Sequence, residues 1–304
     1  MAAPYSHVNR DSTTDWITNR FGATALFVAV FLGFGVLTAA QFSSGVNVVE
    51  VYATVTDQSG EPLRGLMRDD FVIGEDNQQQ TISTFAAGDF PLSVAIAVDR
   101  SFSMAQGGRL GVAKSAAKVF LRELRGEDEA MVLAIGSTVE TVAPRSTRRE
   151  EQSAAIDRLE PWGSTGLHDA IIAGIDGVQD AKGRRALVLL SDGDDRFSTA
   201  TAGDALSRAR RSDVMVYPIA MGRERPPLFV ELAALTGGRS FHVREPKQLP
   251  DTLRGIAREL RYQYLLGYTP ARPIVAGEER WRSINVTVNR PNVRVRARDG
   301  YLAK

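Results

Sequence analysis

Five oxygen-bearing side chains lie in three short polar segments of the sequence. Asp99, Ser101 and Ser103 occupy alternate positions in the first segment, Thr165 lies in the second, and Asp192 lies in the third. Carboxylates and hydroxyls are hard oxygen ligands, which suit Mg²⁺, Mn²⁺ and Ca²⁺, and Mg²⁺ in particular uses few carboxylates and keeps some waters. The residue types therefore indicate a divalent cation site if the fold brings the three segments together.

The elements that must position these side chains alternate between apolar strand-like runs and helical patterns from residue 91 to residue 261. This alternation predicts an α/β domain with a doubly wound, mainly parallel sheet that is covered by helices on both faces. Ligands of such sheets bind beyond the carboxyl ends of the strands, where the three polar segments are expected to meet. The expected strands are 92–98, 130–135, 186–190 and 214–220, and the expected helices are 110–124, 149–159, 167–178, 202–211, 227–235 and 248–261.

β-branched, alternating residues predict further strands on both sides of this domain, at 46–56, 71–73 and 81–85 before it and at 262–268, 283–288 and 293–297 after it. Within the domain, His242 is expected to lie on a short strand. Neither flanking segment is long enough to build a core alone, so the two are expected to combine into one small β-domain. The sequence thus predicts four parts. They are a leader at 1–40, a β segment at 41–90, the α/β domain at 91–261, and a second β segment at 262–304.

The leader contains an uncharged, largely apolar run from residue 21 to residue 40, directly after Arg20. Its apolar core and the small residues Thr38 and Ala40 suit an export signal that is cleaved before Gln41. The alternative is a retained membrane anchor, because the run approaches the roughly 20 residues that a spanning helix needs, with Arg20 on the cytoplasmic side. Either interpretation places the rest of the chain outside the cytoplasm, as a secreted, periplasmic or membrane-anchored protein.

The pattern Asp99-x-Ser101-x-Ser103, followed by a separate Thr165 and a separate Asp192, resembles the metal-ion-dependent adhesion site of the von Willebrand factor type A family. The resemblance implies a Rossmann-like fold in which Ser101 and Ser103 bind the metal directly and Asp99 binds it directly or through water. It also implies that Thr165 and Asp192 complete the ligand set. In that family a partner's carboxylate fills the open coordination position, so the implied partner is a protein that presents an Asp or Glu.

The resemblance extends from about residue 46 to residue 301. The segments 55–60, 264–268 and 295–301 are similar to a bacterial subfamily described as von Willebrand factor type A-related, which is common in soil acidobacteria. This subfamily has no biochemical role that can be transferred to the chain. Arg100 is a departure, because the family usually has a small or uncharged residue there. A cation at this position could weaken metal binding, or it could point outward and select an acidic partner.

Several of these residues also have simpler interpretations. An Asp or Ser after a strand often caps the next helix, but the combination of Asp99 with the other two segments favours a metal site. Asp194 and Asp195 are expected to form a solvated turn rather than an accessory cation site. His168 lies on the helix that follows Thr165, where it is expected to be packed or solvated rather than to take part in the site.

Composition limits the other classes of function. The formal net charge of +1 argues against nucleic acid as a partner, and the absence of cysteine excludes thiolate chemistry and Cys-ligated metal centres. The sequence lacks a Gly-x-Ser-x-Gly elbow, a Gly-x-x-x-x-Gly-Lys phosphate loop and a Gly-x-Gly-x-x-Gly dinucleotide turn, and His242 has no visible nucleophile partner. The protein is therefore expected to bind a partner and not to be an enzyme.

Two alternatives stay open at this point. Asp99 could be the nucleophile of a Mg²⁺-dependent phosphohydrolase with Asp192 on the metal, as in haloacid dehalogenase-like enzymes, although Ser101 stands where their second Asp belongs. The domain could instead be a scaffold of a cell-envelope assembly in which the ion only holds loops in place. A structural ion changes stability, whereas an adhesion-site ion changes the affinity for a partner.

Overall fold

A six-stranded sheet forms the centre of the computed structural model, which describes residues 48–88, 90–193, 195–275 and 277–303. Its strands follow the order β10-β9-β8-β5-β6-β7, and every neighbouring pair is parallel except β6 with β7. The expected α/β fold with a mainly parallel sheet is thereby confirmed. The strands are β5 (Leu92–Asp99), β6 (Glu129–Ile135), β7 (Val139–Ser146), β8 (Arg184–Ser191), β9 (Met215–Ala220) and β10 (Phe241–His242).

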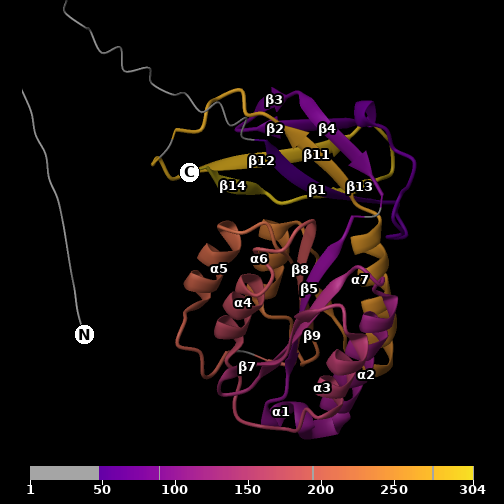
Figure 1. The fold of residues 1–304 in the computed structure, drawn as a ribbon, viewed down its shortest axis with the longest axis vertical. Helices are drawn as coiled ribbons and strands as arrows, with labels where there is room; N and C mark the ends of the chain where they lie inside the picture. The colour runs from indigo at the N-terminus through magenta and orange to yellow at the C-terminus, as the bar shows by residue number, and fades with distance from the viewer. Residues whose placement is uncertain (1–47, 89, 194, 276, 304) are drawn as a thin grey trace, which may run out of the picture. The chain divides into compact units, whose positions relative to one another are not determined.

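Helices cover both faces of this sheet (Figure 1). Helices α2, α3 and α7 pack on one face, and α4, α5 and α6 pack on the other. Because β5 is covered on both faces, all of its residues are buried and the strand is apolar almost throughout. The α-helices are α1 (Phe102–Ala105), α2 (Arg109–Glu123), α3 (Arg149–Asp157), α4 (Leu167–Asp176), α5 (Ala202–Arg210), α6 (Pro227–Thr236) and α7 (Leu249–Arg261).

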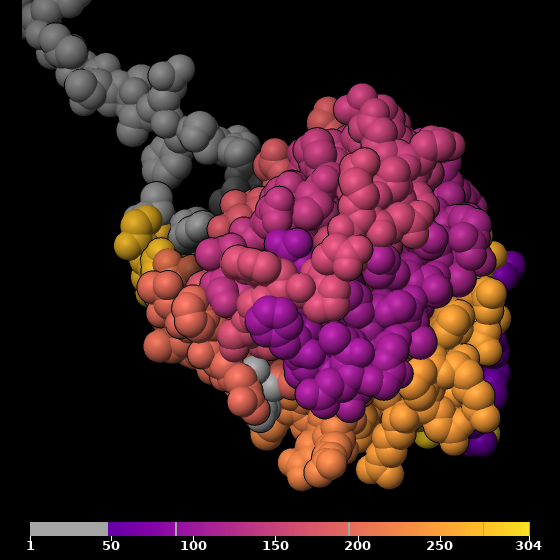
Figure 2. Space-filling model, turned by 90° about the horizontal axis from the view of Figure 1, so that it is seen from below, coloured from indigo at the N-terminus to yellow at the C-terminus, as the bar shows by residue number. Residues whose placement is uncertain are grey.

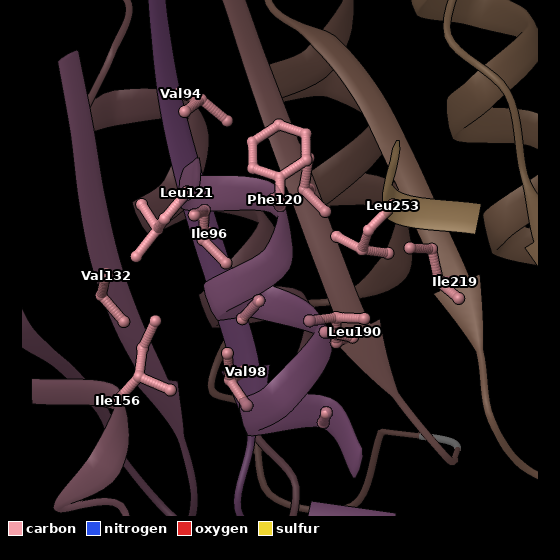
Figure 3. Close-up of a cluster of buried hydrophobic side chains, with 14 of the residues drawn as sticks. Val94, Ile96, Val98, Phe120, Leu121, Val132, Ile156, Leu190, Ile219 and Leu253 are labelled. Carbon is pink, nitrogen blue, oxygen red and sulfur yellow. The ribbon is translucent and has the colours of Figure 1, made fainter. Parts of the chain in front are cut away.

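The face of the sheet under α2 and α7 holds one large part of the hydrophobic core. Figure 3 shows Val94, Ile96 and Val98 of β5 close to Phe120 of α2 and Leu253 of α7. Phe120 is fully buried, and burial of a side chain of this kind contributes about 1.5–3 kcal/mol. The apolar residues of α2 recur every three or four positions, as one helix face requires. This packing holds β5, and with it the polar segment that follows the strand.

Two four-stranded antiparallel sheets are built from both flanking segments of the chain. Their strand orders are β13-β1-β11-β4 and β14-β12-β2-β3, and β1 pairs with β11 while β2 pairs with β12. The two segments therefore combine as expected, whereas the domain boundaries after residues 40, 90 and 261 stay predictions. The strands are β1 (Val49–Thr56), β2 (Phe71–Glu75), β3 (Gln78–Gln80), β4 (Ile82–Ala87), β11 (Tyr264–Tyr268), β12 (Arg280–Val288), β13 (Arg294–Arg296) and β14 (Gly300–Ala303).

A buried ion pair lies inside this antiparallel part. The Arg282 guanidinium of β12 lies 2.8 Å from one carboxylate oxygen of Glu75 of β2. The other oxygen of Glu75 accepts hydrogen bonds from the hydroxyls of Tyr268 and Tyr301 at 2.7 and 2.8 Å. Burial and the contact with Glu75 raise the pKa of both tyrosines. Both oxygens of Glu75 are paired, which offsets the cost of burying the carboxylate.

The antiparallel sheets contact the α/β part through Arg296 of β13. Its guanidinium lies 2.5 Å from the carboxylate of Glu259 of α7, which also accepts a hydrogen bond from the Tyr217 hydroxyl of β9 at 2.8 Å. Burial raises the pKa of Tyr217 well above its usual value. All described residues belong to one compact unit.

The structure adds three strands, β3, β7 and β14, which the sequence pattern does not predict. Each of them lies at the edge of its sheet. Strand β7 includes Pro144, which an edge strand tolerates because one side of it has no ladder to complete. The predicted leader at 1–40 lies outside the described residues. Within the described ranges, no helix is long and apolar enough to span a membrane.

Candidate metal centre

The three polar segments meet at the carboxyl end of the parallel sheet, which Figure 2 shows from below. Asp99 is the last residue of β5, Asp192 directly follows the neighbouring strand β8, and Thr165 comes just before α4. A backbone hydrogen bond joins the first loop to the second, because the Trp162 N–H donates to the Arg100 carbonyl oxygen at 2.7 Å. The fold thus brings together segments that are far apart in the sequence.

Asp99 is completely buried at the centre of this end of the sheet. One of its carboxylate oxygens accepts the Ser101 backbone N–H at 2.8 Å, and the other accepts the Ser191 hydroxyl at 2.6 Å. Burial raises the pKa of Asp99, and these hydrogen bonds act in the opposite direction. A divalent cation close to this carboxylate would favour its ionised form, so the buried acid suits a cation site.

Ser101, Ser103 and Asp192 form a continuous series of oxygens. The hydroxyl oxygens of Ser101 and Ser103 are 3.0 Å apart, and the Ser103 hydroxyl donates to a carboxylate oxygen of Asp192 at 2.9 Å. Ser101 stands at the N-cap position of the short helix α1, but its side chain makes no capping hydrogen bond. Helix capping therefore does not explain the Ser101 hydroxyl.

Thr165 is buried between the second and third loops. Its carbonyl oxygen accepts hydrogen bonds from the backbone N–H groups of Arg196 and Phe197 at 2.9 and 3.0 Å. These bonds attach the threonine loop to the loop that follows β8. The Thr165 hydroxyl is not part of the hydrogen-bonded series of oxygens, so it belongs to the site through its position and not through a direct contact.

A depression of about 950 Å³ opens over these oxygens, and we call it the site depression. Ser101, Ser103, Thr165 and Asp192 line the site depression, whereas the buried Asp99 is not part of its lining. The structure therefore places four of the predicted residues on one surface. The fifth, Asp99, is hydrogen-bonded to the backbone of one of them.

Arg109 is a residue of the site that was not predicted from the sequence. It begins helix α2, and its guanidinium donates to Asp192 at 2.7 Å and to the Ser103 carbonyl oxygen at 3.3 Å. The Asp192 side chain is only 4% exposed, compared with 31% for Arg109. A positive charge in the first turn of a helix opposes the helix dipole, which is the sequence signal that could have marked Arg109 for a tertiary role.

Arg100 does not face the site depression. Its guanidinium lies 2.8 Å from a carboxylate oxygen of Glu140, and its centre lies 5.2 Å from the centre of the Trp162 ring. Both contacts hold the side chain on β7 and the threonine loop. The family departure at Arg100 therefore leaves the candidate ligands unobstructed.

The expectation of a solvated turn is wrong for Asp195. Its carboxylate accepts the backbone N–H groups of Leu167 and His168 at 2.7 and 3.2 Å, so it caps helix α4 from another loop. His168 is packed as expected, with its Nδ1 3.1 Å from the Ala200 carbonyl oxygen. Asp194 lies outside the described residues.

The donor set suits a hard divalent cation. In the described ranges no group of three or more His, Cys, Asp or Glu side chains gathers as a metal site. The candidate site instead combines two carboxylates with three hydroxyls, and such a set suits Mg²⁺ that keeps some of its waters. Ser101 and Ser103 would hold the ion, with Asp99, Thr165 and Asp192 around them. The ion would supply positive charge and an open coordination position.

A doubly wound α/β sheet with oxygen ligands on the loops at its carboxyl end defines a class of binding domains. Residues 94–194 match the family model of the von Willebrand factor type A domain. The matched range includes all five candidate residues. This third of the chain is therefore similar to von Willebrand factor type A domains, whereas membership of the acidobacterial-type subfamily stays a prediction.

Solved structures show the same fold. A von Willebrand factor type A protein from Catenulispora acidiphila has 15% sequence identity and a TM-score of 0.52, with 77% of this chain and 72% of that chain covered. Proximal thread matrix protein 1 from the mussel byssus has 14% identity and a TM-score of 0.50, with 61% and 49% covered. At these identities the likeness shows the fold alone. No curated protein matches the sequence.

Proposed function

We propose that this chain is a metal-dependent protein-binding module. A divalent cation, Mg²⁺ or alternatively Mn²⁺ or Ca²⁺, is held by Ser101, Ser103 and Asp99, with Thr165 and Asp192 completing the ligand set. Its open coordination position takes an Asp or Glu carboxylate of a partner protein. The observation that supports this most is the series of oxygens spaced 3.0 and 2.9 Å apart, next to a buried carboxylate.

Protein binding fits this site better than catalysis. Von Willebrand factor type A domains generally mediate interactions between proteins. The phosphohydrolase alternative needs an acid/base group two residues after Asp99, where Ser101 stands. Asp99 is also buried with both carboxylate oxygens hydrogen-bonded, so it could attack a substrate only after the loop reorganised.

The second candidate is a scaffold in which the ion only holds the loops in place. Backbone hydrogen bonds already join these loops, since the Phe102 N–H donates to the Gly163 carbonyl at 3.1 Å and the Gly166 N–H to the Gly136 carbonyl at 2.9 Å. The loops are therefore already connected without an ion. An ion with an open face toward the site depression fits recruitment of a ligand better than loop fixation.

The proposed location is outside the cytoplasm, with the chain secreted, periplasmic or held at a membrane by its N-terminus. This part of the proposal rests only on the sequence of the apolar leader at 1–40. Assignment to the acidobacterial-type subfamily is proposed on the same basis. Fractionation of cells that express the tagged chain, with and without the leader, tests the location.

Calorimetric titration of Mg²⁺, Mn²⁺ and Ca²⁺ into the chelator-treated protein tests the site itself. We expect about one ion to bind per chain, and we expect Asp192→Asn to weaken binding at least about tenfold. Asp176→Asn is the matched control, because Asp176 also pairs with an arginine, Arg208 at 2.5 Å, on the far end of α4. Equal binding by the parent and Asp192→Asn up to millimolar metal would exclude the proposed site.

Metal dependence of partner capture separates adhesion from scaffolding. A bridging ion should change both the affinity for the partner and the melting temperature, since binding to the folded state alone stabilises it. A purely structural ion should raise the melting temperature and leave partner affinity unchanged. That second result would favour the scaffold over the proposed module.

A further inference from the structure

Besides Arg109, three arginines line the site depression together with the candidate metal ligands, and the carboxylate residue Glu224 belongs to the same lining. Arg223 and Arg225 belong to the segment between β9 and α6, and Arg196 belongs to the loop after β8. All three are exposed residues. The sequence pattern suggests no role for this segment, because the two arginines flank Glu224 and the local charge is mixed.

These guanidinium groups have few partners within the molecule. Among the described residues, none of the ion pairs includes Arg196, Arg223 or Arg225, and Arg225 makes a single side-chain contact, 3.4 Å from the Ser240 hydroxyl. Arg208, by comparison, pairs with Asp176 at 2.5 Å. The three guanidinium groups therefore present positive charge that is available to a ligand, and it exceeds the single negative charge of Glu224 beside them.

The arginine segment is fixed against the candidate metal centre. The backbone of Gly222 approaches Asp192 so closely that a Cβ at this position would lie 1.9 Å from the Asp192 carbonyl oxygen. The next residue back, Met221, donates its N–H to the Ser191 carbonyl at 2.8 Å. His242 holds the segment from β10, with its Nε2 3.1 Å from the Gly222 carbonyl oxygen. The backbone from which Arg223 and Arg225 extend is therefore packed directly against the Asp192 loop.

Exposed aromatic side chains belong to the same three loops. Phe102, Trp162 and Phe197 are 64%, 43% and 58% exposed, and they are the described aromatic residues among the large exposed apolar side chains. Phe102 lines the site depression, Phe197 directly follows Arg196, and Trp162 precedes the threonine loop. Aromatic residues and arginines are enriched in protein interfaces and supply many of their strongest contacts, so the exposed Phe102 in the lining, with Phe197 next to Arg196, indicates a binding surface.

We propose that the site depression binds an acidic segment of a partner protein that presents at least two carboxylates and an apolar side chain. One carboxylate is directed to the metal, and this contact rests on the proposed function. A second carboxylate pairs with Arg223 and Arg225, and the apolar side chain packs on Phe102 and Phe197. The arginine contact does not depend on the metal, so it adds affinity and sets the orientation of the segment.

A protein segment fits this surface better than nucleic acid does. The formal net charge of the chain is only +1, which gives no overall positive field to attract a phosphate backbone. The three arginines line a depression of about 950 Å³, a volume within the usual range of sites that hold small groups. A segment with a few carboxylates matches both the charge and the size.

Fluorescence anisotropy with a short fluorescein-labelled peptide of Asp, Glu and Leu tests the inference on the full chain. Binding is measured in Mg²⁺ and in chelator, at low and high salt, for the parent and for Arg223→Ser/Arg225→Ser. The matched control is Arg68→Ser/Arg294→Ser, which removes the same charge from exposed residues of the antiparallel part. A peptide with Asn and Gln in place of the acids controls for apolar binding.

We expect the Arg223/Arg225 double variant to lose about three- to tenfold in affinity in both Mg²⁺ and chelator, with a weaker dependence on salt, while the control variant binds like the parent. Equal affinity of the double variant and the parent would overturn the inference, even if Mg²⁺ strengthens binding and the proposed function stands. If the double variant loses affinity for the peptide but Mg²⁺ has no effect on binding by the parent, the inferred arginine contact is supported and the proposed function is wrong. Equally tight binding of a single-stranded oligonucleotide would overturn the choice of a protein segment.

Discussion

The guanidinium of Arg109 lies 2.7 Å from a carboxylate oxygen of Asp192, 83 residues away in the sequence. The same carboxylate accepts the Ser103 hydroxyl through its other oxygen. Asp192 therefore already pairs with a cationic group, the Arg109 guanidinium of α2. A divalent ion that takes Asp192 as a ligand must compete with this partner or share the carboxylate with it.

We expect Arg109→Gln to bind Mg²⁺ about three- to tenfold more tightly than the parent, because the substitution removes a competing and repelling positive charge. Calorimetry at constant ionic strength measures the change. Arg208→Gln is the matched control, since it removes an arginine from an ion pair with Asp176 outside the site. Unchanged or weaker binding by Arg109→Gln would show that Arg109 does not compete with the ion.

Asp99→Asn should separate stability from metal binding. Burial raises the pKa of Asp99, so the folded protein keeps its proton to a higher pH than the unfolded chain does. Stability in chelator should therefore fall as the pH rises from the unfolded-state pKa through the folded-state pKa. An asparagine cannot ionise, so we expect the variant to be at least as stable as the parent at neutral pH, yet unable to bind the metal.

Urea unfolding in chelator at acidic and neutral pH measures this difference, and calorimetry checks the metal. Asn can still accept one hydrogen bond, and the Ser191 hydroxyl can reverse its role and accept from the new amide. Asp176→Asn serves again as a control with an exposed carboxylate. If Asp99→Asn is less stable than the parent by the same amount at both pH values, ionisation of the buried Asp99 does not destabilise the parent, and the prediction is wrong.

Thr165→Val tests the hydroxyl that makes no contact with the other ligands. The substitution keeps the shape of the side chain and the backbone bonds from Arg196 and Phe197, so we expect a change in unfolding free energy of no more than about 1 kcal/mol. Metal affinity should nevertheless fall severalfold, and Thr165→Ser should restore it. Full metal affinity in Thr165→Val would remove Thr165 from the proposed ligand set.

Glu75→Ala should destabilise the antiparallel part by about 3–5 kcal/mol, because it leaves the charge of Arg282 buried without its partner. The two side chains are only 3% and 4% exposed. The exposed pair of Glu61 with Arg258 provides the comparison, and Glu61→Ala should cost less than about 1 kcal/mol. Urea unfolding of both variants measures the difference, and similar small losses would mean that water reaches Arg282.

Much of the fold follows from local sequence patterns. The apolar period of β5 and of α2 is set by neighbouring residues, so each element is recognisable without its partners. Edge strands β3, β7 and β14 cannot be recognised in the same way, because they are short or mixed in composition and their local patterns are weak. Their pairing depends on an adjacent strand and not on their own pattern.

The sequence by itself determined the α/β class, most of the strands and helices, the resemblance to the von Willebrand factor type A family, and the spacing of Asp99, Ser101 and Ser103. Only the tertiary structure decided that Arg109 pairs with Asp192, that Asp195 caps α4, and that Arg196, Arg223 and Arg225 line the same depression as the candidate ligands. The physical reason is the separation along the sequence of the residues that make each feature. Periodicity and short motifs are properties of adjacent residues, whereas ion pairs, caps and depressions join groups that only the packed sheet brings within a few ångströms of one another.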